Sequence, residues 1–438
     1  MLFKKTAILH QSSTSRKDYV AACRFFNNDQ VNYQNISKPL VLQTAKAAAG
    51  KSIIVGQDTS EINYEDHAGY LSRSDKDLGP VGNNKDLGFF LHPSIVIDEQ
   101  NEMLLGVSDV YIWNRSYEKQ DKYGRQYAKQ DIEEKESYRW ITAAQRSKEV
   151  LKEASSILFV ADREADIYEE FIAVPDKRCD VLIRSRANRQ LYEREDKLYE
   201  VLAAAPEAGN ISLNVRSAKN RQARQTSLSI KYSKVCIARP RTARENLPAY
   251  VELYAIEVKE AATTVPEGGK PICWILLTTK PVNNLSEALH LIRCYALRWQ
   301  IELVFGTIKS EGLDLEGSEL ESGKALKSMA VMALITALRI NQLRLARNNA
   351  AIPATIIFTF TQIALLHALI KTLEGKTQAQ KNNYPAETMA WAVWVIARLG
   401  GWKGYSKSES PPGNKTMRIG WNDFNRIYQG WNIAQPSL

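Results

Sequence analysis

Residues 155–166 read SSILFVADREAD, a run of apolar and β-branched residues that stops at Asp162. A run of this length and composition predicts a buried strand, and an acid follows its last apolar residue directly. Residues 52–58, SIIVGQD, repeat the pattern and stop at Asp58. The carboxyl ends of parallel strands meet at one edge of a sheet, so we expect the two aspartates to lie close together.

The segments around these two strands follow a recognisable order. Apolar runs predict strands over 87–98 and 103–114, helical spacing follows over 138–154, and another strand is expected over 179–186. Strands in direct succession, followed by strands that alternate with helices, are typical of a mixed α/β sheet with helices on its faces. We therefore expect a mixed α/β core.

The second half of the chain changes character twice. From 190 to 280 the helical signal fades, and strand-like runs separated by Gly, Pro and Asn predict a mostly β insertion subdomain. After residue 281 the spacing is mostly helical, which predicts an α-helical C-terminal region. The stretch 351–370 lacks Asp, Glu, Lys and Arg, but Pro353 and its polar residues favour a buried helix, or a helix plus turn, over a membrane span.

The positive charge of the chain is concentrated in one segment. The formal net charge is +9, and residues 184–244 contain 14 Lys and Arg against five acids, so this segment carries the whole excess. A localised basic surface is the electrostatic footprint of a polyanion such as nucleic acid. The alternative is the ordinary charged surface of a soluble domain. Five scattered cysteines and charges within the N-terminal residues predict a reducing, cytoplasmic setting without a membrane partner.

Residues 295–309, YALRWQIELVFGTIK, predict an amphipathic helix. On a helical projection its Tyr295, Arg298, Glu302 and Lys309 fall within an arc of about 60°, beside an apolar face. This stripe could hold a metal ion with the carboxylate and a phosphate with the other three side chains. The alternative is a core helix with an ordinary Arg–Glu pair four residues apart.

Three acids are candidates for a metal site: Asp58, Asp162 and Glu302. Either aspartate alone would be read as a capped strand end or a salt-bridge partner. Together with Glu302 they would repel one another, and divalent cations relieve such repulsion. Mg²⁺ prefers hard oxygen ligands, and two ions about 4 Å apart can stabilise the attacking and leaving oxygens of a phosphoryl displacement. We therefore expect two Mg²⁺ ions in each site, with Mn²⁺ as a substitute.

These motifs resemble those of a known family. QDTS surrounds Asp58, ADREADIY surrounds Asp162, and Tyr295-x2-Arg298-x3-Glu302-x6-Lys309 has the spacing of a YREK signature. VLIRSR, WILLTTKPV and ARLGGWKG also stand in the family's order, at 181–186, 274–282 and 397–404. Over roughly residues 20 to 438, the chain resembles DDE transposases of the bacterial insertion-sequence-four family, the transposon-five-like branch.

The resemblance implies a fold and a set of site residues. The fold is a ribonuclease H-like mixed sheet core, interrupted by the β insertion and followed by the helical C-terminal region. Asp58, Asp162 and Glu302 would be the catalytic, metal-binding triad. Tyr295, Arg298 and Lys309 would bind the transposon-end DNA backbone.

Two further positions are DNA contacts by resemblance. Arg184 matches a family position beside the active site, and its alternative is a surface arginine in a basic segment. Trp274 matches an aromatic platform for a flipped base, and its alternative is core packing. For the neighbouring Trp299 we expect packing.

The function implied is cut-and-paste DNA transposition. A homodimer would bind double-stranded DNA at the inverted-repeat ends and the target, hydrolyse phosphodiesters by two-metal chemistry, and transfer strands through a hairpin intermediate. Only 57 residues precede Asp58, whereas family members begin with a longer end-recognition domain. The alternatives are therefore an N-terminally truncated, non-catalysing regulator or relic that inhibits full-length transposase by dimerising with it, and a metal nuclease without strand transfer.

The same reasoning divides the chain into five segments. They are a shortened helical N-terminal remnant, the first part of the core, the basic β insertion, the second part of the core with the Glu302 helix, and a helical region expected to dimerise; their ranges are 1–50, 51–189, 190–280, 281–345 and 346–438.

Overall fold

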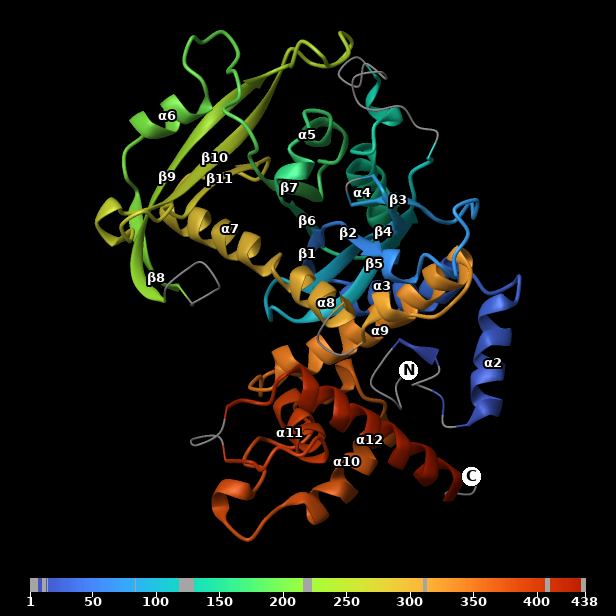
Figure 1. The fold of residues 1–438 in the computed structure, drawn as a ribbon. Coiled ribbons are helices and arrows are strands. Elements are labelled where there is room, and N and C mark those ends of the chain that lie inside the picture. The colour runs from blue at the N-terminus through green and yellow to red at the C-terminus, as the bar shows by residue number, and fades with distance from the viewer. Residues whose placement is uncertain are drawn as a thin grey trace. The chain divides into compact units, whose positions relative to one another are not determined.

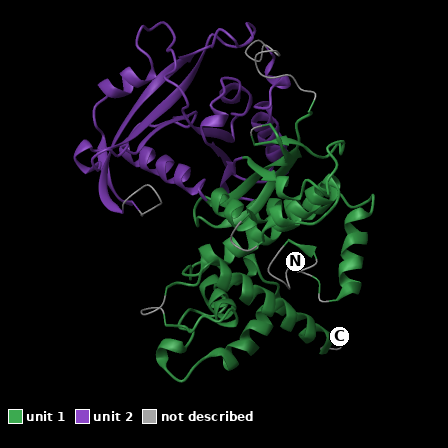
Figure 2. Cartoon of the chain, viewed as in Figure 1, with its two compact units in different colours: residues 1–48, 59–119, 300–438 green, residues 49–58, 120–299 purple. Residues whose placement is uncertain are grey.

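The chain forms two compact units, coloured separately in Figure 2. Unit 1 comprises Met1–Ala48, Thr59–Lys119 and Gln300–Leu438, and unit 2 comprises Ala49–Asp58 and Gln120–Trp299. The computed structural model describes residues 7–9, 13, 15–82, 84–117, 130–215, 223–309, 313–405 and 410–434.

Unit 2 contains a mixed sheet of both parallel and antiparallel strands. Its order is β1-β6-β7-β11-β10-β9-β8. The first three strands are parallel, and every later pairing is antiparallel. The strand bounds are Ser52–Gln57 (β1), Ser156–Ala161 (β6), Cys179–Arg184 (β7), Gly209–Val215 (β8), Arg224–Ala238 (β9), Tyr250–Glu260 (β10) and Cys273–Thr278 (β11). Strands β8 to β11 therefore belong to the same sheet as β1, β6 and β7.

Helices cover parts of this sheet. In Figure 1 α6 lies beside β9 and β10, which it contacts. Helix α7 begins after Asn284, whose side chain accepts a 3.0 Å hydrogen bond from the Glu287 N–H and caps the first turn. The bounds are Ile132–Glu134 (η3), Tyr138–Val150 (α4), Arg163–Ala165 (η4), Glu170–Ala173 (α5), Leu198–Ala204 (α6), Ala262–Thr264 (η5) and Leu285–Leu297 (α7).

Unit 1 contains an antiparallel group of strands centred on β4. This strand pairs with β2, β3 and β5, and α3 packs on β5. Gly106 in β5 has a φ of 154°, and a Cβ there would collide with the Thr44 side chain of α3, so glycine permits the close approach. The bounds are Arg16–Asn27 (α2), Tyr33–Ala48 (α3), Ser60–Asn63 (β2), Glu65–His67 (η1), Gly79–Val81 (β3), Asp86–Asp98 (β4) and Leu104–Trp113 (β5).

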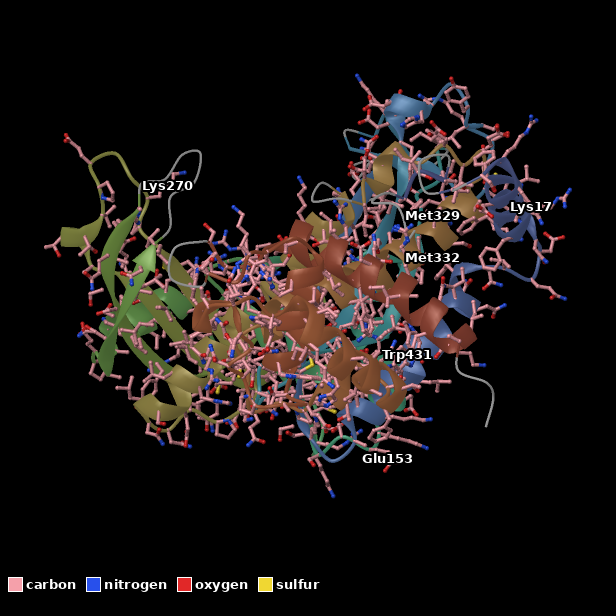
Figure 3. The ribbon with its side chains drawn as sticks, turned by 90° about the horizontal axis from the view of Figure 1, so that it is seen from below. Lys17, Glu153, Lys270, Met329, Met332 and Trp431 are labelled. Carbon is pink, nitrogen blue, oxygen red and sulfur yellow. The ribbon has the colours of Figure 1, made fainter. Side chains whose placement is uncertain are left out.

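The rest of unit 1 is helical. Helix α9 is buried on nearly all sides, and its Met329, labelled in Figure 3, is fully buried. By length and composition α9 is also the one described helix that could cross a membrane, although 72% of its apolar window is buried. The bounds are Gln300–Lys309 (α8), Leu315–Gly317 (η6), Gly323–Ala346 (α9), Ala354–Ile356 (η7), Phe360–Leu373 (α10), Gln378–Gln380 (η8), Met389–Leu399 (α11) and Asn414–Ala434 (α12).

The predicted fold class is confirmed: the protein is mixed α/β with a helical C-terminal region. The stretch 351–370 forms the short η7 followed by most of α10, the helix-plus-turn arrangement expected from its sequence. Two short strands, β2 and β3, were not predicted.

Candidate active site at the strand ends of unit 2

The register of β1 and β6 places Asp58 beside Asp162. The ladder pairs Gly56 with Val160, two residues before each aspartate. Neighbouring positions in register on parallel strands lie about 4.8 Å apart and direct their side chains to the same face. The aspartate side chains are 21% and 35% exposed, so solvent reaches both carboxylates.

The β6–β7 ladder adds Arg184 to this row. Its last pair, Ala161 and Ile183, immediately precedes Asp162 and Arg184. Nη1 of Arg184 lies 3.8 Å from Oδ1 of Asp162. Nη2 donates a 3.1 Å hydrogen bond to the backbone carbonyl of Cys273 in β11. Arg184 therefore lies next to Asp162 and is held in place by a hydrogen bond to the protein backbone.

A second guanidinium, that of Arg298, lies across both carboxylates. Its Nη1 donates a 2.8 Å hydrogen bond to Oδ2 of Asp58, and its Nη2 lies 3.9 Å from Oδ2 of Asp162. The Arg298 side chain is only 7% exposed. Its guanidinium carbon lies 5.9 Å from the centre of the Tyr295 ring. Arg298 thus contacts both carboxylates from a largely buried position.

Tyr295 completes this cluster. Its hydroxyl donates a 3.2 Å hydrogen bond to Oδ1 of Asp162. Burial, and next the nearby Asp162 charge, raise the pKa of Tyr295 above its ordinary value. The hydroxyl therefore stays protonated at neutral pH and acts as a hydrogen-bond donor. The structure brings Asp58, Asp162, Arg184, Tyr295 and Arg298 together within unit 2.

The expectation of one continuous helix over 295–309 is wrong. Helix α7 ends at Leu297 and α8 begins at Gln300. At the junction, the N–H groups of Arg298 and Trp299 bond to carbonyls three residues earlier, each at 3.1 Å. Such a 3₁₀ turn advances about 120° per residue, so it breaks the phase on which the single stripe was projected.

Glu302 and Lys309 lie beyond this break, on α8 in unit 1. Glu302 is half-buried. Nζ of Lys309 lies 3.3 Å from Oε1 of Glu316, which also accepts a 2.9 Å hydrogen bond from the Asn63 N–H. Lys309 therefore has an acidic partner within its own unit.

The two tryptophans differ from each other. Trp274 is half-buried in β11, and its ring lies 5.7 Å from the Tyr295 ring, centre to centre. This contact is the packing alternative, and a base-stacking role for Trp274 stays a prediction. The expectation that Trp299 packs in the core is wrong, because its side chain is 61% exposed. It lies in the turn between α7 and α8 rather than on the buried face of either helix.

The aspartate pair fits a divalent cation. Two carboxylates from neighbouring strand ends provide hard oxygen donors on one face, and a cationic guanidinium already bridges them. Asp162 precedes η4 as its N-cap residue, yet its side chain makes no capping hydrogen bond, so capping does not occupy the carboxylate. Asp58 and Asp162 are therefore residues of unit 2 that could hold a metal ion.

The basic segment 184–244 is partly neutralised from outside. Five of its cations pair with acids: Arg184 with Asp162, Arg189 with Asp166, Arg224 with Glu260, Lys234 with Glu252, and Arg244 with Asp131 and Glu133. Arg216, Lys219 and Arg221 lie outside the described residues. Arg186 and Arg241 are exposed. The charge available to a polyanion is therefore smaller than the sequence count suggests.

One buried acid close to the site was not predicted. Asp166 is fully buried and accepts hydrogen bonds from Nε and Nη2 of Arg189, at 2.9 and 2.6 Å. Its other oxygen accepts a 2.7 Å bond from the Arg186 N–H. Asp166 thereby ties the turn after Asp162 to the segment that follows β7. Its position within ADREAD is visible in the sequence, but its partner is not.

Comparison with known proteins gives two findings. The family model described as "Transposase DDE domain" matches residues 120–339, half of the chain. The match includes Asp162, Arg298 and Glu302 and begins after Asp58. A solved structure, the cryo-EM structure of the piggyBac transposase synaptic complex with hairpin DNA, matches with a TM-score of 0.37 and 8% identity. The match covers 94% of this chain and 62% of that chain, less than two thirds of it.

Proposed function

Because the chain belongs to the family of transposase DDE domains, we propose that it is a DNA transposase whose active site lies at the ends of β1 and β6. The main support is the in-register pair of Asp58 and Asp162, with Arg298 across both carboxylates. The spacing of Tyr295, Arg298, Glu302 and Lys309 further supports a place in the insertion-sequence-four group.

The aspartates and Glu302 would hold divalent metal, for which we propose two Mg²⁺ ions. When bound, the metal would supply Lewis-acid stabilisation of the phosphoryl group and a more acidic water. Arg298 offers a planar fork of N–H donors that matches two phosphate oxygens. The Tyr295 hydroxyl and the Lys309 ammonium would donate to the same backbone. These donors would orient the scissile phosphate and offset negative charge that develops on it.

The reaction would proceed by successive phosphoryl displacements. In the first, a water oxygen bonds to phosphorus, the bond from phosphorus to the 3′ oxygen breaks, and a proton from the water ends on that oxygen. The freed 3′-OH then attacks a phosphate of the opposite strand, and the bond from that phosphorus to the 3′ oxygen of the flanking DNA breaks, which gives a hairpin and releases the flanking DNA with a 3′-OH. A second water attacks the hairpin phosphate and frees the 3′-OH of the element again. In strand transfer, the same 3′-OH attacks a target phosphate and releases a target 3′-OH. We propose that a homodimer performs these steps on double-stranded DNA.

A cleavage assay with strand transfer tests this function. The substrate is a duplex carrying the inverted repeats that flank the gene, with Mg²⁺ and a supercoiled target. We expect nicks at the repeat ends and insertion products, both lost in Asp162→Asn. The matched control is Asp196→Asn, which removes an exposed acid of the insertion and should cleave normally.

Three other outcomes would contradict the proposed function. Binding to the repeats without cleavage would indicate the non-catalysing regulator. Nicks without insertion products would indicate a metal nuclease. Neither binding nor cleavage, with Asp162→Asn identical to the wild type, would exclude a transposase acting on these ends.

A further inference from the structure

We propose that Arg298 is a built-in counter-ion that competes with divalent metal for Asp58 and Asp162, so that metal binds weakly until a DNA phosphate takes the guanidinium away. The DNA part of this competition rests on the proposed function. The competition between guanidinium and metal concerns the protein alone and can be measured without DNA.

The contacts show that both cations would need the same oxygens. Arg298 reaches Oδ2 of Asp58 at 2.8 Å and lies 3.9 Å from Oδ2 of Asp162. A divalent ion held between in-register aspartates would take oxygens from this same pair. The Arg298 side chain is 7% exposed, so water screens its pairing far less than that of a surface ion pair.

The position of Arg298 is prepared by its surroundings. The residue follows the last turn of α7, where the partial negative charge of the helix end favours a cation. Its backbone N–H is held by the Tyr295 carbonyl at 3.1 Å, and its guanidinium lies beside the Tyr295 ring. Tyr295 in turn donates to Asp162. The guanidinium therefore lies over the carboxylates with little freedom left to lose.

The positive charges already present at the aspartates indicate which group a metal ion would displace. Two carboxylates face two guanidinium groups, because Arg184 lies 3.8 Å from Asp162 on the side away from Asp58. Both aspartates are already close to a guanidinium, so a divalent ion that bound between them would meet two positive charges at close range. Arg184 lies beside Asp162 alone and donates to the Cys273 carbonyl, whereas Arg298 spans both aspartates, whose oxygens the metal would take. Arg298 is therefore the cation that metal would displace.

A backbone phosphate supplies the other half of the exchange. It presents two oxygens to the guanidinium fork, as a carboxylate does, and carries one negative charge. Transfer of Arg298 to a phosphate would release both aspartates for metal. Because coupling between two binding sites is reciprocal, metal should strengthen DNA binding by the same factor.

Mn²⁺ binding to the full chain, measured by electron paramagnetic resonance, tests this directly. Without DNA, we expect Arg298→Gln to bind Mn²⁺ at least tenfold more tightly than the wild type, and its metal-free Tm to fall. Arg298→Lys keeps the charge but loses the fork, and should fall between the two. Arg184→Gln removes the guanidinium next to Asp162 and should change the Kd for Mn²⁺ less than Arg298→Gln does. Arg194 is an exposed cation far from the aspartates in sequence, and Arg194→Gln should leave the Kd for Mn²⁺ unchanged.

Duplex DNA with the repeat ends provides the second arm. It should tighten Mn²⁺ binding by the wild type at least tenfold and have little effect on Arg298→Gln. Equal or weaker Mn²⁺ binding by both Arg298 variants, with native circular dichroism, would overturn the competition. If Arg298→Gln binds Mn²⁺ more tightly but the wild type does not cleave DNA, the proposed competition would stand and the proposed transposase function would be rejected.

Discussion

Replacement of Asp166 by Asn should destabilise unit 2 strongly although it changes only one atom. The carboxylate is fully buried and accepts two hydrogen bonds from Arg189 and one from the Arg186 N–H. Asparagine would present an NH₂ group to one of these sets of donors. It would also leave the Arg189 guanidinium, 14% exposed, without a counter-ion.

The size of the loss can be worked from these contacts. Removing one partner of a buried ion pair costs about 3–5 kcal/mol. Arg189 keeps some exposure and its 2.5 Å bond to the Asp166 backbone carbonyl, so we expect the lower end, about 3 kcal/mol. For a unit of this size, that corresponds to a fall in Tm of roughly 6–12 °C.

Urea denaturation followed by circular dichroism measures the change in the free energy of unfolding. Arg189→Met and the double variant complete a cycle, in which a coupled pair makes the double variant less unstable than the sum of the singles. Asp196→Asn is the control, because its carboxylate is exposed. A loss below about 1 kcal/mol for Asp166→Asn, or additivity within about 0.5 kcal/mol, would refute the pairing as a source of stability.

Three further predictions concern pH and salt. Burial raises the pKa of Glu170 from 4.5 to about 8, so the folded state binds the carboxyl proton more tightly than the unfolded state. The free energy of unfolding should therefore fall by about 3–4 kcal/mol as pH rises from 4.5 to 8. Glu170→Gln should flatten this part of the profile when the urea midpoint is measured against pH. Hydrogen bonds from Arg224 lower the pKa of Glu260 to about 2, so the ionised carboxylate contributes its full stabilisation above about pH 4.5 and loses it as pH falls toward 2. Arg224→Met should reduce this loss of stability in acid, measured by the same titration of the urea midpoint. Arg186→Gln should weaken DNA binding and reduce the slope of log K against log salt by about 1, whereas Lys17→Gln, on α2, should leave the slope unchanged in a filter-binding titration.

Strands β1 and β6 could be predicted because each is almost entirely buried and consists mostly of apolar residues. Their ends placed Asp58 and Asp162 correctly. β2 and β3 are only four and three residues long, too short for a periodic signal. Their existence depends on pairing with β4, which is a tertiary effect.

The site itself was only partly predictable. A helical projection assumes one continuous helix, so it could not show the 3₁₀ turn at Arg298 or the exposure of Trp299. Charge counting within a segment also ignores partners far away in the chain. Arg244 pairs with Asp131, 113 residues earlier, and no local pattern indicates that contact.

The register of β1 and β6 places Asp58 and Asp162 at the same distance from the start of their strands. SIIVGQD and SILFVAD each begin with a serine and end with an aspartate, and Ser52 pairs with Ser156. Loss or gain of one residue inside either strand would send its aspartate to the opposite face of the sheet. Connections between the strands carry no such restriction. Among relatives of this chain, insertions and deletions should therefore occur between residues 58 and 156 and be absent within the two segments 52–58 and 156–162.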